Sequence, residues 1–466
     1  MALSLPISLF GQTSQSRAEY LRYTEAQPIL EALVEALPAD LKRLNPDELA
    51  KAWPNWIRGR DSEIRARLAQ GDEDSLVNFL LFGTSYTQRP RVTIKEIAEI
   101  RGDGALTSGA RVVPVIQGRV DDLIRDLGAA GKNERLLFAR NVLLTQKGHT
   151  LTTTQDRARL KNYLLTSVVR NLREQASYVK AVESARLLGD PTEEFAERSR
   201  VFRTRGLSSD TSLLPNLALE ESLKAIRTRG LLTAISVRRV AIVGPGLDFT
   251  DKQEGYDFYP QQTIQPFAIV DTLLRLGLAS PDVLQVTTFD LSPRVNHHLA
   301  LAQQRARHGQ RYVVQLPRDL QAQWKPEAIG YWKQFGDQIG TAVSPVNLPA
   351  NAGDLKIRAV SIRPSIATRI TPVDLNIVLQ HMDLPTAERF DLIIATNIFI
   401  YYDTFEQSLA LANVEHMLRP GGIMLSNNAL LELPFSRVRS VDYLTVVYSD
   451  RPDDGDHIVW YQRLPD

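Results

Sequence analysis

The stretch that decides the fold is Phe390–Asp403, FDLIIATNIFIYYD, together with Met417–Ile423, MLRPGGI. The first stretch is a short run of mostly β-branched and aliphatic residues that leads into the polar pair Thr396–Asn397, and the second enters a new apolar run through two glycines. The residues between them are long enough for one helix. This order of strand, polar tip, helix, glycine turn and strand predicts an α/β domain in the C-terminal half of the chain.

A second strand-to-helix unit is predicted upstream. Val237–Val243 is a short β-branched run that ends at Gly244-Pro245-Gly246, and Pro266–Leu276 has the apolar spacing of a helix. Gly244 and Gly246 would let a ligand approach the backbone closely, because no side chain stands in its way. The alternative interpretation is a plain turn between a strand and a helix, without a ligand.

Polar residues follow the other predicted strands. Val283–Phe289 ends on Asp290, where Rossmann-like domains place a carboxylate that accepts hydrogen bonds from ribose hydroxyls. Asn376–Gln380 is predicted as a further strand followed by Asp383, which could accept from an adenine amino group. Because ligands bind outside the carboxyl ends of parallel strands, one site is expected to gather Gly244, Gly246, Asp290, Asp383 and Asn397. Capping of loops and helices is the alternative role for the polar members of this set.

Residues from about 236 to 466 resemble the class I S-adenosylmethionine (SAM)-dependent methyltransferases, whose sheet ends in an antiparallel hairpin. Within that class the chain is most similar to chemotaxis-receptor glutamate methyltransferases. The segments that carry the likeness are Gln265–Phe267, Thr288–Arg294, Asn397–Tyr402 and Leu418–Gly422. The resemblance implies a mostly parallel, seven-stranded Rossmann-like sheet with a C-terminal hairpin. It also implies SAM as cofactor and a small-molecule or protein methyl acceptor, with a carboxylate favoured.

The chain departs from the family pattern at three places. Ile242 and Val243 stand where methyltransferases commonly have an acidic residue before the first glycine, and Asp248 fills the third glycine position. The segment from about Gly309 to Arg369 enlarges the space between the second and third strands, and acceptor recognition is expected there. These departures keep open an alternative in which the fold binds a ligand or a partner protein without catalysis.

The methyl acceptor decides whether a general base is needed. A carboxylate acceptor requires none, whereas a hydroxyl or an amine would, and the sequence offers His381, Asp403 and Tyr401. An inserted loop, Asp248–Gln265, carries the aromatic residues Tyr256, Phe258 and Tyr259. They either cover a cationic ligand, since ring faces attract cations, or pack against the helical half.

The N-terminal half has a helical pattern in place of alternating strands and helices. Residues 16–235 show mostly helical apolar spacing, as in Ala18–Leu37 and Asp156–Leu187, so an α-helical domain of unknown role is expected before a methyltransferase domain at 236–466. Residues 1–15 are interpreted as a tail or a signal-peptide remnant, because Ala2–Gln12 resembles the end of an export signal without its basic start. A cytoplasmic location is expected, with export as the alternative if the signal is truncated.

Composition excludes several classes of function. Lys+Arg 55 against Asp+Glu 54 gives a formal net charge of +1, so no overall field would attract nucleic acid. The chain has no cysteine, which rules out disulfides, thiolate metal sites and a cysteine nucleophile. His297 and His298 are adjacent and cannot share a helix face, so they are interpreted as surface residues and no metal site is expected. No stretch has the roughly 20 apolar residues of a membrane span.

Overall fold

The computed structural model describes residues 18–92, 96, 105–188, 202, 205–249, 256–350, 352–451 and 454–465. The predicted tail or signal-peptide remnant lies outside these ranges. Within them, no helix is both long enough and apolar enough to cross a membrane.

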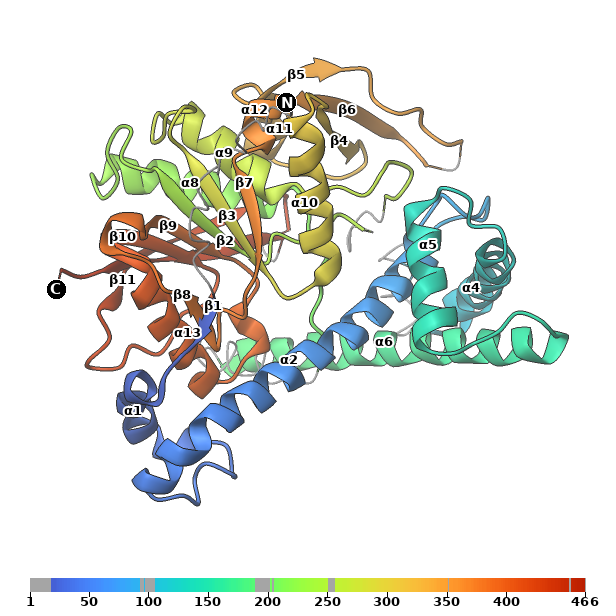
Figure 1. Cartoon of the computed structure of the whole chain (residues 1–466). Coiled ribbons are helices and arrows are strands. Elements are labelled where there is room, and N and C mark those ends of the chain that lie inside the picture. Colours follow the sequence, from blue (N-terminus) through green and yellow to red (C-terminus); the bar gives the residue numbers. More distant parts are fainter. Residues whose placement is uncertain are drawn as a thin grey trace, which may run out of the picture.

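A seven-stranded sheet forms the centre of the described molecule (Figure 1). Its strands, in spatial order, are β11 (Val438–Val447), β12 (Gly455–Arg463), β10 (Leu418–Ser426), β9 (Phe390–Ala395), β2 (Arg239–Val243), β3 (Gln285–Asp290) and β7 (Ile370–Asp374). The strands from β10 to β7 run parallel, and β12 runs antiparallel to both β10 and β11. Numbered along the chain within this sheet, the order is 3-2-1-4-5-7-6. The predicted fold class is thereby confirmed.

The two central strands are buried on both faces. β9 is buried at every position, and β2 is buried at every position after Arg239. Val240 is paired with Leu392 on one side and with Val286 on the other. Continuous apolar runs of this kind are typical of parallel strands that are covered on both faces, which is why their sequence pattern does not alternate.

The third strand of the sheet differs from the prediction. The third strand is β7, next to β3. Most of the predicted strand Asn376–Gln380 lies in a loop. Its last residue, Gln380, begins β8 (Gln380–Met382), which pairs antiparallel with β1 (Ala18–Tyr20) in a separate two-stranded sheet. β7 contains Pro372, which lacks a backbone donor, and it lies at the edge of the sheet, where a proline is tolerated. Asp383 therefore does not follow a strand of the main sheet.

The segment between β3 and β7 forms a small sheet of its own. Its strands are β4 (Tyr312–Asp319), β5 (Gly340–Val343) and β6 (Leu355–Ile362), in the antiparallel order β4-β6-β5, with α11 (Pro326–Gln334) and α12 (Pro364–Ala367) beside them. This addition lies at the top of the view in Figure 1, next to α9 and α10. It corresponds to the enlarged segment expected from the sequence.

Helices cover the sheet and extend away from it. They are α1 (Tyr23–Ala32), α2 (Pro46–Phe82), α4 (Ala105–Leu127), α5 (Glu134–Arg140), α6 (Thr154–Leu188), α8 (Pro215–Thr228), α9 (Gln265–Arg275), α10 (Pro293–Arg307) and α13 (Thr404–Met417). Asn45 caps α2 by accepting from the Glu48 N–H at 3.1 Å. The predicted helix Ala18–Leu37 begins later, because Ala18–Tyr20 is a strand.

The hydrophobic core does not follow the division at residue 235. Ile29 of α1 and Trp53 and Ile57 of α2 pack in one cluster with Val243 of β2 and Phe399, on one face of the sheet. α8 packs on the opposite face with α9. The end of α2 forms a separate helical core with α4, α5 and α6. The first helices of the N-terminal half thus belong to the packing of the sheet, as the course of α2 past it in Figure 1 also shows.

Candidate functional site

A hollow lies at the carboxyl ends of β2 and β3, and we call it the strand-end hollow. Its empty volume is about 570 Å³, open solvent included. Residues that line it include Gly244, Gly246, Asp290, Leu375, Asn376 and Tyr402. Small-molecule and cofactor sites typically have mostly apolar walls and a few polar groups. The hollow therefore has the lining of a ligand site.

The glycine turn after β2 has a conformation that side chains rarely adopt. Gly244 and Gly246 both have φ +64°. A Cβ on Gly244 would collide with the Ile398 side chain, and a Cβ on Gly246 would lie 2.7 Å from the Ser209 carbonyl oxygen. The glycines are required by close packing of the chain as well as by backbone conformation.

Asp290 ends β3 inside the strand-end hollow. Its side chain is buried, and Oδ1 accepts a hydrogen bond from the Ser292 N–H at 2.8 Å. Burial raises the pKa of this carboxyl to about 6, against the lowering effect of backbone hydrogen bonds from Ser292 and Gly246. A buried carboxylate that lines a mostly apolar hollow is well suited to accept hydrogen bonds from hydroxyl groups of a ligand.

A second hollow adjoins the first, and we call it the outer hollow. The two share Ser208, Asp210, Gly244, Ile398 and Tyr401. The outer one also contacts Gln265 and Asn397, and its empty volume is about 1130 Å³ including open solvent. Asn397 is exposed, has φ +59°, and donates its N–H to Asn427 Oδ1 at 2.9 Å. Asn397 thus lies beside the outer hollow, next to the glycine turn.

The structure brings four of the five predicted residues together. Gly244, Gly246 and Asp290 line the strand-end hollow, and Asn397 lines the outer one. Asp383 is exposed beyond β8 and lines neither, so its expected place among the others is wrong. The cause is the misassigned third strand: Leu375, Asn376 and Ile377, directly after β7, line the hollow instead.

Of the three candidate bases, one lies at the site. Tyr401 lines both hollows. Asp403 caps α13, where it accepts from the Glu406 N–H at 2.9 Å. His381 is buried in β8 and contacts Asn413, away from both hollows. The contacts of Asp403 and His381 are structural. Tyr401 is the one candidate base of the three that lines the hollows.

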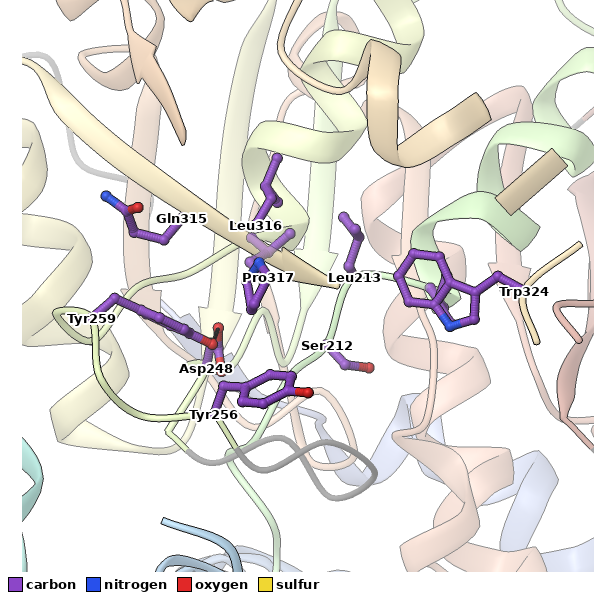
Figure 2. Close-up of a pocket in the computed structure, with 11 residues that line it drawn as sticks. Ser212, Leu213, Asp248, Tyr256, Tyr259, Gln315, Leu316, Pro317 and Trp324 are labelled. Atoms are coloured by element: carbon purple, nitrogen blue, oxygen red, sulfur yellow. Dashed lines mark hydrogen bonds between the residues drawn. The ribbon is translucent and has the colours of Figure 1, made fainter. Parts of the chain in front are cut away.

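The aromatic loop lines a third hollow, shown in Figure 2, with an empty volume of about 510 Å³ including open solvent. Tyr256 and Tyr259 lie on one side of it and Trp324 on the other. The Tyr259 hydroxyl donates to Asp248 Oδ2 at 2.8 Å. Arg91 lies over the Tyr256 ring at 4.5 Å, so the loop packs on the helical half and does not cover the strand-end hollow. Asp248, at the third glycine position, holds this loop.

Sequence reasoning missed the part that α2 and the segment Ser208–Asp210 contribute. Leu68 of α2 and Ser208–Asp210 line the strand-end hollow, and the Leu247 N–H donates to the Ser209 carbonyl at 2.7 Å. Two arginines fasten α2 here: Arg65 Nη1 lies 2.7 Å from Asp374 Oδ1, and Arg67 Nη1 donates to the Tyr401 carbonyl at 3.0 Å. The stretch around Ser208 has only the composition of a turn, so nothing in it indicates a ligand wall.

No protein-family model and no curated protein sequence matches the chain. The solved structure of the N-methyltransferase NodS from Bradyrhizobium japonicum WM9 is 13% identical, with a TM-score of 0.25, over 53% of this chain and 98% of that one. The CurJ carbon methyltransferase is 13% identical, with a TM-score of 0.26, over 95% and 98% of the two chains.

A third solved structure, the glycopeptide N-methyltransferase MtfA complexed with SAM, is 13% identical, with a TM-score of 0.21, over 55% of this chain and 80% of that one. At such scores the strand order, and not the overall likeness, carries the assignment of the fold. The parallel strands in the order 3-2-1-4-5, completed by an inserted antiparallel strand and its hairpin partner, give the C-terminal half the class I methyltransferase fold.

Proposed function

We propose that this chain is a SAM-dependent methyltransferase whose methyl donor binds in the strand-end hollow. The observation that carries the proposal is Asp290, a buried carboxyl at the end of the strand next to the glycine turn. In Rossmann-like domains a carboxylate at this place accepts hydrogen bonds from the ribose of a bound nucleotide. The resemblance of the sequence to methyltransferases and the strand order of the sheet support the same assignment.

The residues present fit an adenosine-containing cofactor. Leu291, Leu375 and Ile377 offer apolar surface for an adenine ring, and Asp290 offers the acceptor for ribose hydroxyls. The glycine turn keeps the backbone at Gly244 close to the boundary between the two hollows. When bound, SAM supplies a methyl group that is activated by the positive charge on sulfur.

The protein's own contribution would be alignment and exclusion of water. The outer hollow gives an acceptor access to the glycine turn, and its polar lining includes Gln265, whose Nε2 donates to Thr396 Oγ1 at 3.0 Å. Leu68 and Ser208–Asp210 close the strand-end hollow on the helical side. Correct placement of two reacting groups supplies a large part of a rate enhancement on its own.

A carboxylate is the acceptor that this site favours, in line with the resemblance to glutamate methyltransferases. A carboxylate attacks without losing a proton, and the site does not place His381 or Asp403 where either could remove one. Tyr401 is positioned to donate a hydrogen bond to the acceptor. Whether the carboxylate belongs to a protein or to a small molecule is a question for the acceptor search.

One observation favours a second function, a binding module without methyl transfer. The space in front of the glycines is partly taken by Ile398 and by the Ser209 carbonyl of the chain itself. If these groups hold their positions, the fold binds a ligand smaller than SAM or a partner protein. Binding measurements separate the two functions.

The test is calorimetric titration of the whole chain with SAM and with S-adenosylhomocysteine. We expect micromolar binding that weakens about tenfold or more in Asp290→Asn, because the variant loses a charged hydrogen-bond acceptor. Asp383→Asn is the matched control: it makes the same change at the exposed aspartate outside the hollows, and should bind like the unmodified chain. Absence of heat at millimolar SAM would favour the binding module.

A further inference from the structure

Two histidines and a glutamate meet at a place remote from both hollows. Glu25 lies in the first turn of α1, His381 in β8 and His416 in the last turn of α13. One ligand atom from each lies within 4.8 Å of the other two. His416 Nε2 is 3.8 Å from Glu25 Oε1, and the two imidazole rings are stacked with centroids 4.6 Å apart. Three separate segments of chain thus present nitrogen and oxygen ligands to one point.

Hydrogen bonds determine which nitrogen of His381 carries the proton. The Asn413 amide donates from Nδ2 to the carbonyls of Ile377 at 3.1 Å and Val378 at 2.9 Å, which turns its oxygen toward His381. His381 Nδ1 lies 3.0 Å from that oxygen, which can only accept. Nδ1 therefore carries the hydrogen, and Nε2 keeps its lone pair. Histidines that bind metal ions are commonly oriented in this way by an acceptor on the other nitrogen.

The cluster is also accessible. Glu25 and His416 line a hollow with an empty volume of about 860 Å³, open solvent included, whose wall also contains Pro28, Leu411 and Phe435. Arg22 competes for the carboxylate, since its Nε donates to Glu25 Oε1 at 2.9 Å. The Arg22 side chain is 75% exposed, and ion pairs of that kind contribute little, so it can turn into solvent.

We propose that Glu25, His381 and His416 bind a divalent transition-metal ion of the zinc class. Two imidazoles and one carboxylate suit zinc and its neighbours better than calcium or magnesium, which prefer oxygen ligands. Ligands around tetrahedral zinc lie about 3.4 Å apart, so the 3.8 Å between His416 and Glu25 requires only a small adjustment. The ion would tie α1 to α13 and β8. No sequence pattern indicates this site, because its ligands lie far apart along the chain.

The experiment titrates the whole chain, freed of metal by a chelator, with Zn²⁺ by calorimetry and with Co²⁺ by visible absorption. We expect one ion per chain and a thermal midpoint that rises with Zn²⁺, because an ion that binds the folded state stabilises it. His416→Ala and Glu25→Gln should each weaken binding about tenfold or more. His308→Ala is the matched control, since this exposed histidine lies outside the cluster and its loss should leave binding unchanged.

Two results would overturn the site: no stoichiometric binding, or binding that persists unchanged in His416→Ala. His416 is the decisive position because its side chain is 37% exposed, so its removal leaves the core intact, whereas a variant of buried His381 could fail to fold. The SAM titration concerns a different hollow, so the metal site and the proposed function can fail independently.

Discussion

Burial gives the Asp290 carboxylate an energetic cost that hydrogen bonds from a ligand would reduce. Its burial raises its pKa from 3.8 to about 6, which corresponds to roughly 3 kcal/mol of disfavoured charge at pH 7. In the native state the carboxyl binds its proton more tightly than in the unfolded chain, so stability contributed by this group falls as the pH rises from about 4 to 6. Costly buried charges of this kind cluster at functional sites.

Asp290→Asn should therefore stabilise the folded chain and, at the same time, weaken the binding of SAM. At pH 7 we expect the free energy of unfolding to rise by about 1–3 kcal/mol. The gain should shrink as the pH falls from about 6 to about 4 and vanish below that, where the aspartate is protonated in both states. Urea unfolding at a series of pH values measures this. A variant that is less stable at pH 7 and at pH 4 alike would contradict the burial argument.

The affinity for SAM should also depend on pH. Ribose hydroxyls donate best to the ionised form of Asp290, so binding should weaken as the pH falls below about 6. Calorimetry between pH 5 and pH 8 tests this, and Asp290→Asn should show a flatter profile. A profile equally steep in the variant would place the titrating group elsewhere.

A substitution of Gly246 tests whether the glycine turn has room for a side chain. Gly246→Ala should cost about 2–4 kcal/mol, because the new Cβ would lie 2.7 Å from the Ser209 carbonyl in addition to the penalty for a positive φ. Gly277→Ala isolates that penalty, since Gly277 has φ +63° and open space around its Cβ, and should cost about 1 kcal/mol. If both variants lost the same stability in thermal unfolding, the Ser209 backbone would move away from the new Cβ at little cost.

At the scale of elements, α2 is fastened to the sheet through one buried aspartate. Asp61 accepts from the Tyr20 hydroxyl and from Asn376 Nδ2, each at 2.7 Å, and from Arg65 Nε at 3.0 Å. It thus joins β1, α2 and the loop that lines the strand-end hollow. Removing a buried group with several partners leaves each of them without an acceptor.

Asp61→Ala should accordingly lower the free energy of unfolding by about 3–5 kcal/mol. The control is Asp121→Ala, which removes an exposed aspartate 2.7 Å from Lys161 and should cost less than about 1 kcal/mol. Denaturant unfolding of both variants measures the difference. A loss in Asp61→Ala as small as in the control would contradict this role for the aspartate.

The elements also show what the sequence could predict. β2, β3, β9 and β10 were recognisable because buried parallel strands form short apolar runs. β7 was missed because it is short, half-exposed and contains Pro372, whereas Asn376–Gln380 is more apolar for a different reason: it is buried by α2 and α13 without pairing in the sheet. Apolar density indicates burial and does not by itself indicate strand pairing.

At the scale of the whole molecule, the first helices of the N-terminal half pack on the central sheet. Leu21, Ile29, Trp53 and Ile57 fill one face of the sheet, and each buried side chain of this size contributes roughly 1.5–3 kcal/mol. The sequence placed a domain boundary near residue 235 because helical periodicity gives way to strands there. Periodicity reports local structure and carries no information about which distant face a helix covers.

A fragment of residues 236–466 should therefore fail to fold cooperatively, because it lacks α1, α2 and α8, which cover the two faces of the sheet. Circular dichroism during heating and binding of a hydrophobic dye measure this, with the whole chain as reference. A sharp transition and no dye binding in the fragment would show that the C-terminal half is an independent domain.

A crystal structure of the chain grown with S-adenosylhomocysteine would show whether the methyl donor occupies the strand-end hollow. We expect the ligand between the glycine turn and Leu375, with ribose oxygens about 3 Å from the Asp290 carboxylate and with Ile398 or Ser209 moved to admit it. A saturated crystal in which the ligand lies elsewhere, or in which Ile398 and Ser209 still fill the space before the glycines, would contradict it.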